Sequence, residues 1–140
     1  MKAHLPRNGT VVRMKPSFPR ALAVEDDTDL HALLETVLAE TVSLTFASTL
    51  AEARRALSSE DFAVMLLDIH LPDGSGMDLL SKVRHLDRCK NLPVIMMTTS
   101  DNAEHYEDSL WLGSLAYVRK PLDITKLSDA VRTALLTARV

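Results

Sequence analysis

The sequence is poor in several features that mark particular classes of protein. Its one cysteine, Cys89, excludes an intramolecular disulfide and a zinc site built on cysteines. No apolar run approaches the roughly 20 residues that span a bilayer, and the N-terminus lacks the apolar centre of a signal peptide. Aromatic residues make up only 4%, so a core must consist mainly of aliphatic side chains and methionine. We therefore expect a cytoplasmic protein without membrane insertion.

The 140 residues suffice for one domain, and a 46% hydrophobic content provides a core for it. The net charge of −3 is unevenly distributed: residues 1–20 carry five basic side chains and no acid, and the rest carries 11 basic and 19 acidic residues. This acidic balance argues against a protein that coats nucleic acid, so no direct nucleic acid binding is expected.

Residues 1–19 contain three prolines and one glycine and show no sustained period. We expect a flexible basic tail there, with a short extended piece at residues 10–14. Two interpretations stay open for this tail: a solvated arm, or an arm that contacts phosphate groups or a membrane surface. Residues 20–140 are expected to form the folded domain.

From residue 20 onward, short apolar runs alternate with segments of helical spacing, which predicts a repeated βα unit. One helical stripe extends to Leu86, and another consists of Tyr106, Leu110 and Trp111. Near-continuous apolar strands are typical of a parallel sheet covered on both faces, so the pattern predicts a doubly wound α/β fold. The expected strands are residues 21–24, 42–46, 62–67, 94–97 and 115–118.

Polar side chains follow four of these runs. Glu25 and Asp26 follow the first, Asp68 the third, Thr98 the fourth and Lys120 the fifth. Ligands of an open parallel sheet bind beyond the carboxyl ends of its strands, where these groups should meet. Carboxylate oxygens without a cluster of histidine or cysteine suit Mg²⁺, and a metal beside a carboxylate and a lysine is typical of phosphoryl transfer. The carboxylate can then act as the nucleophile and form an acyl phosphate.

Residues 23–27, 66–76, 93–99 and 113–121 resemble the receiver domain of two-component response regulators. Each fragment alone is weak, but all four occur in the right order at the right strand ends. The resemblance covers residues 20–138. It implies a flavodoxin-like (βα)5 sheet with strand order 2-1-3-4-5.

The resemblance also implies roles for single residues. Asp68 would accept a phosphoryl group from a phosphohistidine of a partner. Asp26, Asp68 and the backbone carbonyl of His70 would bind Mg²⁺, with Glu25 acting through water. Lys120 would contact the phosphoryl group.

In the same family, Thr98 and Tyr117 resemble the switch pair, in which the hydroxyl moves toward phosphate and the ring turns inward behind it. His70 and Ser100 occupy the positions whose side chains tune the lifetime of the acyl phosphate. Tyr117 and Trp111 are candidates for a partner surface, although Trp111 also fits the edge of the core.

Four other residues are given structural roles. Asp27 is expected to cap the first helix. His31 and His105 are expected to be solvated. Cys89, between two basic residues, is expected to be a surface thiol.

The resemblance implies a signalling phosphoacceptor rather than a turnover enzyme. Its partners would be a sensor histidine kinase or a histidine phosphotransfer protein, and an unknown downstream protein that binds the face made by the fourth helix, last strand and last helix. It would be a monomer or a phosphorylation-dependent dimer. One alternative is the receiver portion of a longer regulator with an output domain. Another is an aspartyl-phosphate phosphatase, although His70 stands where those enzymes place a second aspartate.

Overall fold

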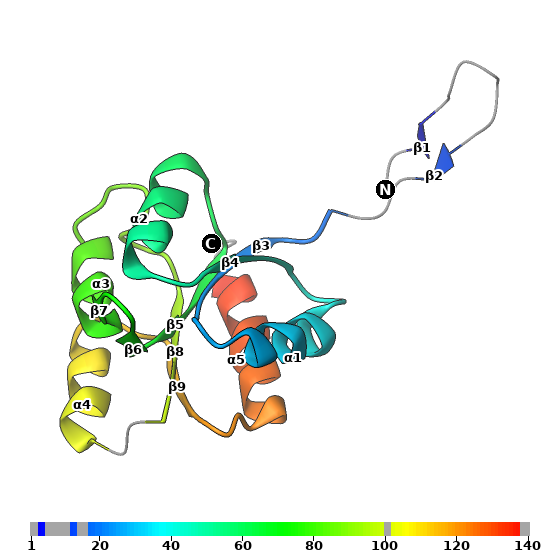
Figure 1. Ribbon diagram of the computed structural model, residues 1–140. Helices are drawn as coiled ribbons and strands as arrows, with labels where there is room; N and C mark the ends of the chain where they lie inside the picture. Colours follow the sequence, from blue (N-terminus) through cyan, green and yellow to red (C-terminus); the bar gives the residue numbers. More distant parts are fainter. Residues whose placement is uncertain (1–2, 5–11, 14–16, 100–101, 138–140) are drawn as a thin grey trace.

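The computed structural model describes residues 3–4, 12–13, 17–99 and 102–137. A parallel five-stranded sheet forms its centre (Figure 1), in the order β4-β3-β5-β8-β9, which is 2-1-3-4-5 along the chain. The expected doubly wound fold is therefore confirmed, and every strand boundary lies within two residues of its prediction. The strands are β3 (Arg20–Val24), β4 (Ser43–Ala47), β5 (Val64–Asp68), β8 (Val94–Thr98) and β9 (Ala116–Arg119).

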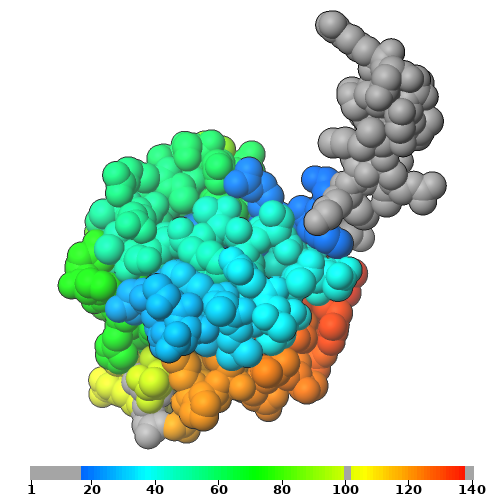
Figure 2. Space-filling view, turned by 45° about the vertical axis from the view of Figure 1, so that its right-hand side comes forward, coloured from blue at the N-terminus to red at the C-terminus, as the bar shows by residue number. Residues whose placement is uncertain are grey.

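Helices cover both faces of the sheet. Side chains alternate along each strand, so in β5 Leu66 packs in the cluster that includes α1 and α5, and Leu67 packs in the cluster that includes α2 and α3. Figure 2 shows the first of these faces, where α1 (blue to cyan) lies beside α5 (orange). The helices are α1 (Thr28–Leu38), α2 (Leu50–Ser59), α3 (Gly76–Val83), α4 (Ala103–Trp111) and α5 (Ile124–Thr137).

Helix α3 ends at Val83, so the prediction that its apolar stripe extends to Leu86 was wrong, and Leu86 is exposed. Arg84 lies at this helix end and donates to four backbone carbonyls, of which Cys89 O is the most distant, at 3.5 Å from Nη1. Its Nε contacts Leu112 O (3.0 Å), Nη1 contacts Leu92 O (2.7 Å) and Nη2 contacts Gly113 O (2.7 Å). One guanidinium thus joins the end of α3 to the start of β8 and the end of α4.

Helix α4 departs furthest from its predicted packing. Ser109 is its one buried residue, whereas Tyr106, Leu110 and Trp111 are all exposed, Trp111 to 90%. The apolar spacing identified the helix correctly, but the apolar side faces outward and the small serine faces the protein. The interpretation of Trp111 as the edge of the core was wrong.

The prediction that Cys89 is a surface thiol was also wrong, because its side chain is buried in the cluster that contains α2 and α3. The turns after α3 direct it inward: Cys89 N donates to Leu86 O (2.9 Å), and Leu92 N donates to Cys89 O (3.0 Å). Burial raises the pKa of the thiol above its ordinary value.

Within the expected tail, β1 (Ala3–His4) and β2 (Val12–Arg13) form a separate antiparallel pair, and β2 falls inside the predicted extended piece. Most of the tail lies outside the described residues, so its division from the domain stays a prediction. Among the residues that the structure describes, no helix has the length and apolar character needed to cross a bilayer.

Candidate functional site

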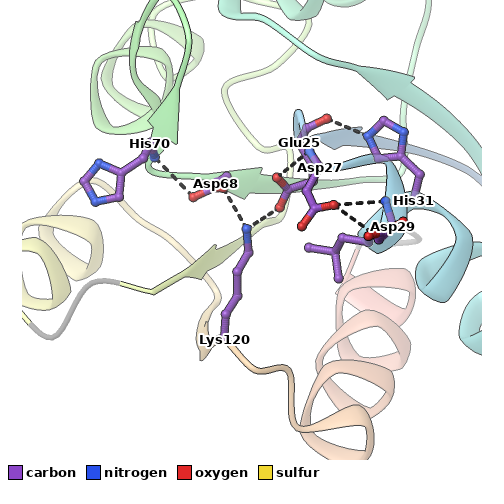
Figure 3. A network of polar contacts seen from close by, with 8 residues as sticks. Glu25, Asp27, Asp29, His31, Asp68, His70 and Lys120 are labelled. Carbon is purple, nitrogen blue, oxygen red and sulfur yellow. Dashed lines mark hydrogen bonds and ion pairs between the residues drawn. The ribbon is translucent and has the colours of Figure 1, made fainter.

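Three carboxyl groups meet at the carboxyl end of the sheet, and Figure 3 shows two of them, those of Glu25 and Asp68. Glu25 follows β3 and is fully buried, and Asp68 ends β5 with 5% exposure. One carboxylate oxygen each from Glu25, Asp26 and Asp68 lies within 4.8 Å of the other two. The structure thus brings together three acids that are spread over two separate strand ends.

Lys120, immediately after β9, points into this acidic group (Figure 3). Its Nζ donates to Asp68 Oδ2 (2.8 Å) and to Glu25 Oε1. Burial alone would lower the pKa of Lys120, but the hydrogen bonds to both carboxylates outweigh it and hold the pKa above its ordinary value. The side chain is therefore a fixed positive charge in contact with Asp68.

Glu25 has partners on both carboxylate oxygens, because Oε2 accepts a hydrogen bond from Asp27 N (3.1 Å). Burial raises the pKa of Glu25, and the bonds from Lys120 and Asp27 oppose that rise. Asp27 itself accepts from Asp29 N (2.9 Å) and Leu30 N (3.4 Å), which confirms it as the cap of α1.

The donors suit a hard divalent cation. Three carboxylates face one ammonium group, which leaves negative charge unbalanced in a largely buried site. Asp26 is exposed while Glu25 and Asp68 are buried, so the group is open to solvent on one side. Oxygen donors in this arrangement fit Mg²⁺, which binds one or two protein carboxylates and keeps several waters.

The segment after Asp68 is a short hairpin, β6 (His70–Leu71) and β7 (Gly74–Ser75), which leads into α3. His70 N donates to Asp68 Oδ1 (3.1 Å), so both oxygens of Asp68 have donors. The His70 imidazole points away from Asp68 (Figure 3). It contacts the ring of His105 in α4, with 6.2 Å between the ring centroids. The expectation that His105 is simply solvated was therefore wrong.

Gly76, the first residue of α3, packs against the backbone of the site. Its N–H donates to Ile69 O (2.7 Å). A Cβ atom at Gly76 would lie 2.0 Å from the carbonyl oxygen of Asp68. The close approach of α3 to the end of β5 therefore requires glycine.

Asp73, on the turn between β6 and β7, contributes to the site region in a way that sequence reasoning missed. Its carboxylate accepts from Leu50 N (2.8 Å) and Ala51 N (3.1 Å) at the start of α2. The bond from Leu50 N comes first among the causes that hold the pKa of Asp73 below its ordinary value. The partners are more than twenty residues away along the chain, so no local pattern predicts this cap.

The proposed switch residues lie on the neighbouring strands β8 and β9. Thr98 is fully buried at the end of β8, and its carbonyl accepts from Lys120 N (2.8 Å). Tyr117 is half-buried on β9, and its ring meets the ring of Tyr106 in α4 edge to face, with 5.4 Å between centroids. Ser100 lies outside the described residues.

His31 was expected to be solvated, but it packs beside the site. Its ring stacks on Phe46 at 4.1 Å between centroids, and its Nε2 lies 2.6 Å from the carbonyl oxygen of Glu25 (Figure 3). Phe46 packs on the face of the sheet that α1 covers, a contact that sequence spacing did not reveal.

Known proteins resemble this chain in sequence and in fold. A family model described as the response regulator receiver domain matches residues 21–132. The response regulator protein PilR of Pseudomonas aeruginosa is 35% identical over 120 residues, which are 85% of this chain and 26% of PilR. Sporulation initiation phosphotransferase F of Bacillus subtilis is 30% identical over 81% of this chain and 90% of its own length.

Among solved structures, the CheY-like receiver domain protein of Methanospirillum hungatei superposes with a TM-score of 0.80 and 31% identity, over 88% of this chain and 98% of that chain. The chain spans between about a quarter and a half of the length of several curated relatives. With the family matched over most of the domain, and with the acidic group at the expected strand ends, the chain belongs to the response regulator receiver domain family.

Proposed function

We propose that Asp68 is the phosphoacceptor of this receiver domain. The observation that carries the proposal is the setting of its carboxylate, which contacts Lys120 Nζ at 2.8 Å and His70 N at 3.1 Å beside two further acids. Burial of a carboxylate is costly unless it is paired and hydrogen-bonded, as Asp68 is, and ionisable groups held together in this way are typical of functional sites.

In the proposed reaction, a carboxylate oxygen of Asp68 attacks the phosphorus of a phosphohistidine. The P–N bond breaks, the imidazole nitrogen of the donor keeps the electron pair, and an acyl phosphate forms on Asp68. Asp26, Asp68 and the backbone carbonyl of His70 would hold Mg²⁺, with Glu25 acting through water. When bound, this ion supplies positive charge that neutralises the phosphoryl oxygens.

Lys120 supplies the second positive charge, and its Nζ donates a hydrogen bond to Asp68 Oδ2. We assign Thr98 and Tyr117 to the switch, because they lie on the paired strands β8 and β9, on the side of β5 that carries Lys120, and the Tyr117 ring contacts α4. Phosphorylation would shift the populations of two conformations of the face made by α4, β9 and α5, on which Trp111 is exposed.

Receiver domains work with histidine kinases or phosphotransfer proteins, and we propose such a partner for this chain, in the cytoplasm, with a downstream protein on the α4 face. We expect the domain to be a signalling phosphoacceptor with at most self-phosphorylation from donors and slow autodephosphorylation, present as a monomer or a phosphorylation-dependent dimer. This chain matches only 26% of the length of PilR, which favours a second candidate: a receiver that belongs to a longer regulator with an output domain.

The proposal is tested by incubating the protein with Mg²⁺ and acetyl phosphate and measuring its intact mass. We expect one labile phosphoryl adduct on the wild type and on Asp78→Asn, an exposed acid of α3 that serves as the matched control. The adduct should be absent from Asp68→Asn and from samples with EDTA. An adduct that persists on Asp68→Asn would refute the assignment, and rapid turnover of phosphate monoesters would favour the phosphatase alternative.

A further inference from the structure

The backbone and the side chain of His70 face different ways. The N–H group donates to Asp68 Oδ1, whereas the imidazole points away from that carboxylate (Figure 3). The ring instead meets the His105 ring, at 6.2 Å between centroids and 65° between planes, an edge-to-face contact. This contact joins the hairpin after Asp68 to the first turn of α4.

The two partners differ in their freedom to move. His70 is exposed, and its backbone is held by pairing with Ser75 and by the bond to Asp68. Only its side-chain torsions can therefore carry the ring elsewhere. His105 is half-buried on a helix, so it is the more fixed of the two rings. The position of the His70 ring is thus decided largely by whether His105 is there to receive it.

We propose that His105 is a positioning residue that keeps the His70 imidazole off Asp68 and so sets how fast the acyl phosphate hydrolyses. This inference rests on the proposed function. In hydrolysis, a water oxygen attacks phosphorus, the P–O bond to Asp68 breaks, the carboxylate recovers the electron pair and inorganic phosphate leaves. The water must approach in line with the breaking bond, from the solvent side of the site.

The direction of the effect on the hydrolysis rate follows from the size of the His70 imidazole. With the ring against His105, the imidazole points away from Asp68, and the acidic group that contains Asp68 is open to solvent at Asp26. Without that contact, the imidazole can turn back over the phosphoryl group, where it excludes water. Loss of the His105 ring should therefore lengthen the life of the phosphorylated state.

The test is to phosphorylate the protein with acetyl phosphate, remove the donor and follow loss of the adduct by intact mass. We expect His105→Ala to slow the loss by about threefold, a modest change typical of partial water exclusion. His105→Phe keeps a ring and should retain a rate close to wild type. In a His70→Ala background, His105→Ala should change nothing. The matched control is His85→Ala, which removes an exposed histidine outside the helices.

Ring signals in NMR spectra provide a readout that needs no phosphoryl transfer. His105→Ala should shift the imidazole signals of His70 and leave those of His85 unchanged, both in the free protein and with beryllofluoride bound. An adduct that decays equally fast in wild type and His105→Ala, or faster in the variant, overturns the positioning role alone. An effect that persists without His70 overturns it as well. A wild type that never takes a phosphoryl group overturns the proposed function and this inference with it.

Discussion

Replacing Gly76 by alanine sets two opposing effects against each other. Alanine is preferred over glycine in a helix by up to about 1 kcal/mol, and less at the first helical position. Against this, the new Cβ would lie 2.0 Å from Asp68 O, where real Cβ atoms stay beyond 3.0 Å, so the backbones must separate by about 1 Å. The obstacle is backbone rather than a flexible side chain, which puts the cost at the upper end of overpacking, about 3 kcal/mol.

The clash should prevail, and Gly76→Ala should destabilise the fold by about 2 kcal/mol, or about 10 °C in Tm for a domain of this size. Thermal and urea unfolding followed by circular dichroism measure this directly. Ser81→Ala, a partly exposed position on the same helix, is the control and should change stability by less than about 0.5 kcal/mol. A Gly76→Ala variant as stable as wild type would show that α3 is free to move away from β5, which contradicts the reasoning.

Three further substitutions or treatments test other contacts. Asp73→Asn should lower the stability of the protein at neutral pH. Because the pKa of Asp73 is lowered in the folded state, its contribution to stability is present above the unfolded pKa of about 4 and is lost as the pH falls through the folded pKa. Urea unfolding curves of the variant and the wild type should therefore converge in acid. Cys89 should react with iodoacetamide at least about tenfold more slowly in the native protein than in urea, and equal rates would mean that the thiol is not buried. Arg84→Ala should lower the free energy of chemical unfolding by about 2–3 kcal/mol. Arg84→Lys should recover little of this stability, because an ammonium group cannot bond three separated carbonyls. Full recovery in Arg84→Lys would mean that the positive charge, and not the hydrogen bonds, stabilises the fold.

The sheet and the acidic group were predictable for one physical reason. A parallel strand covered on both faces must be apolar throughout, so the runs that became β3, β5 and β8 stand out in the sequence. The polar residue that ends each run then lies at a shared edge. Glu25, Asp68 and Lys120 could therefore be grouped without knowledge of any distance.

The failures have a different origin, because each depends on a contact that spacing does not encode. Apolar residues four apart identified α4 but not which side faces inward, so Trp111 was misplaced. Turn geometry decided the burial of Cys89, and the packing of α1 on the sheet placed His31 against Phe46. Asp73 caps a helix far away in sequence. Local pattern specifies which element forms, whereas side-chain direction outside the sheet is set by tertiary contacts.

The sparse burial of α4 has a thermodynamic consequence. With Ser109 as its one buried residue, the helix contributes little to the apolar area that folding removes from water, and it is attached mainly through Arg84 and ring contacts at its other end. Its amide protons should therefore exchange with solvent through local openings that leave the sheet intact. Because α4 has few buried contacts, a free-energy change much smaller than the global stability of the domain can shift it between two positions. The domain can then respond to one covalent group without disturbing its core.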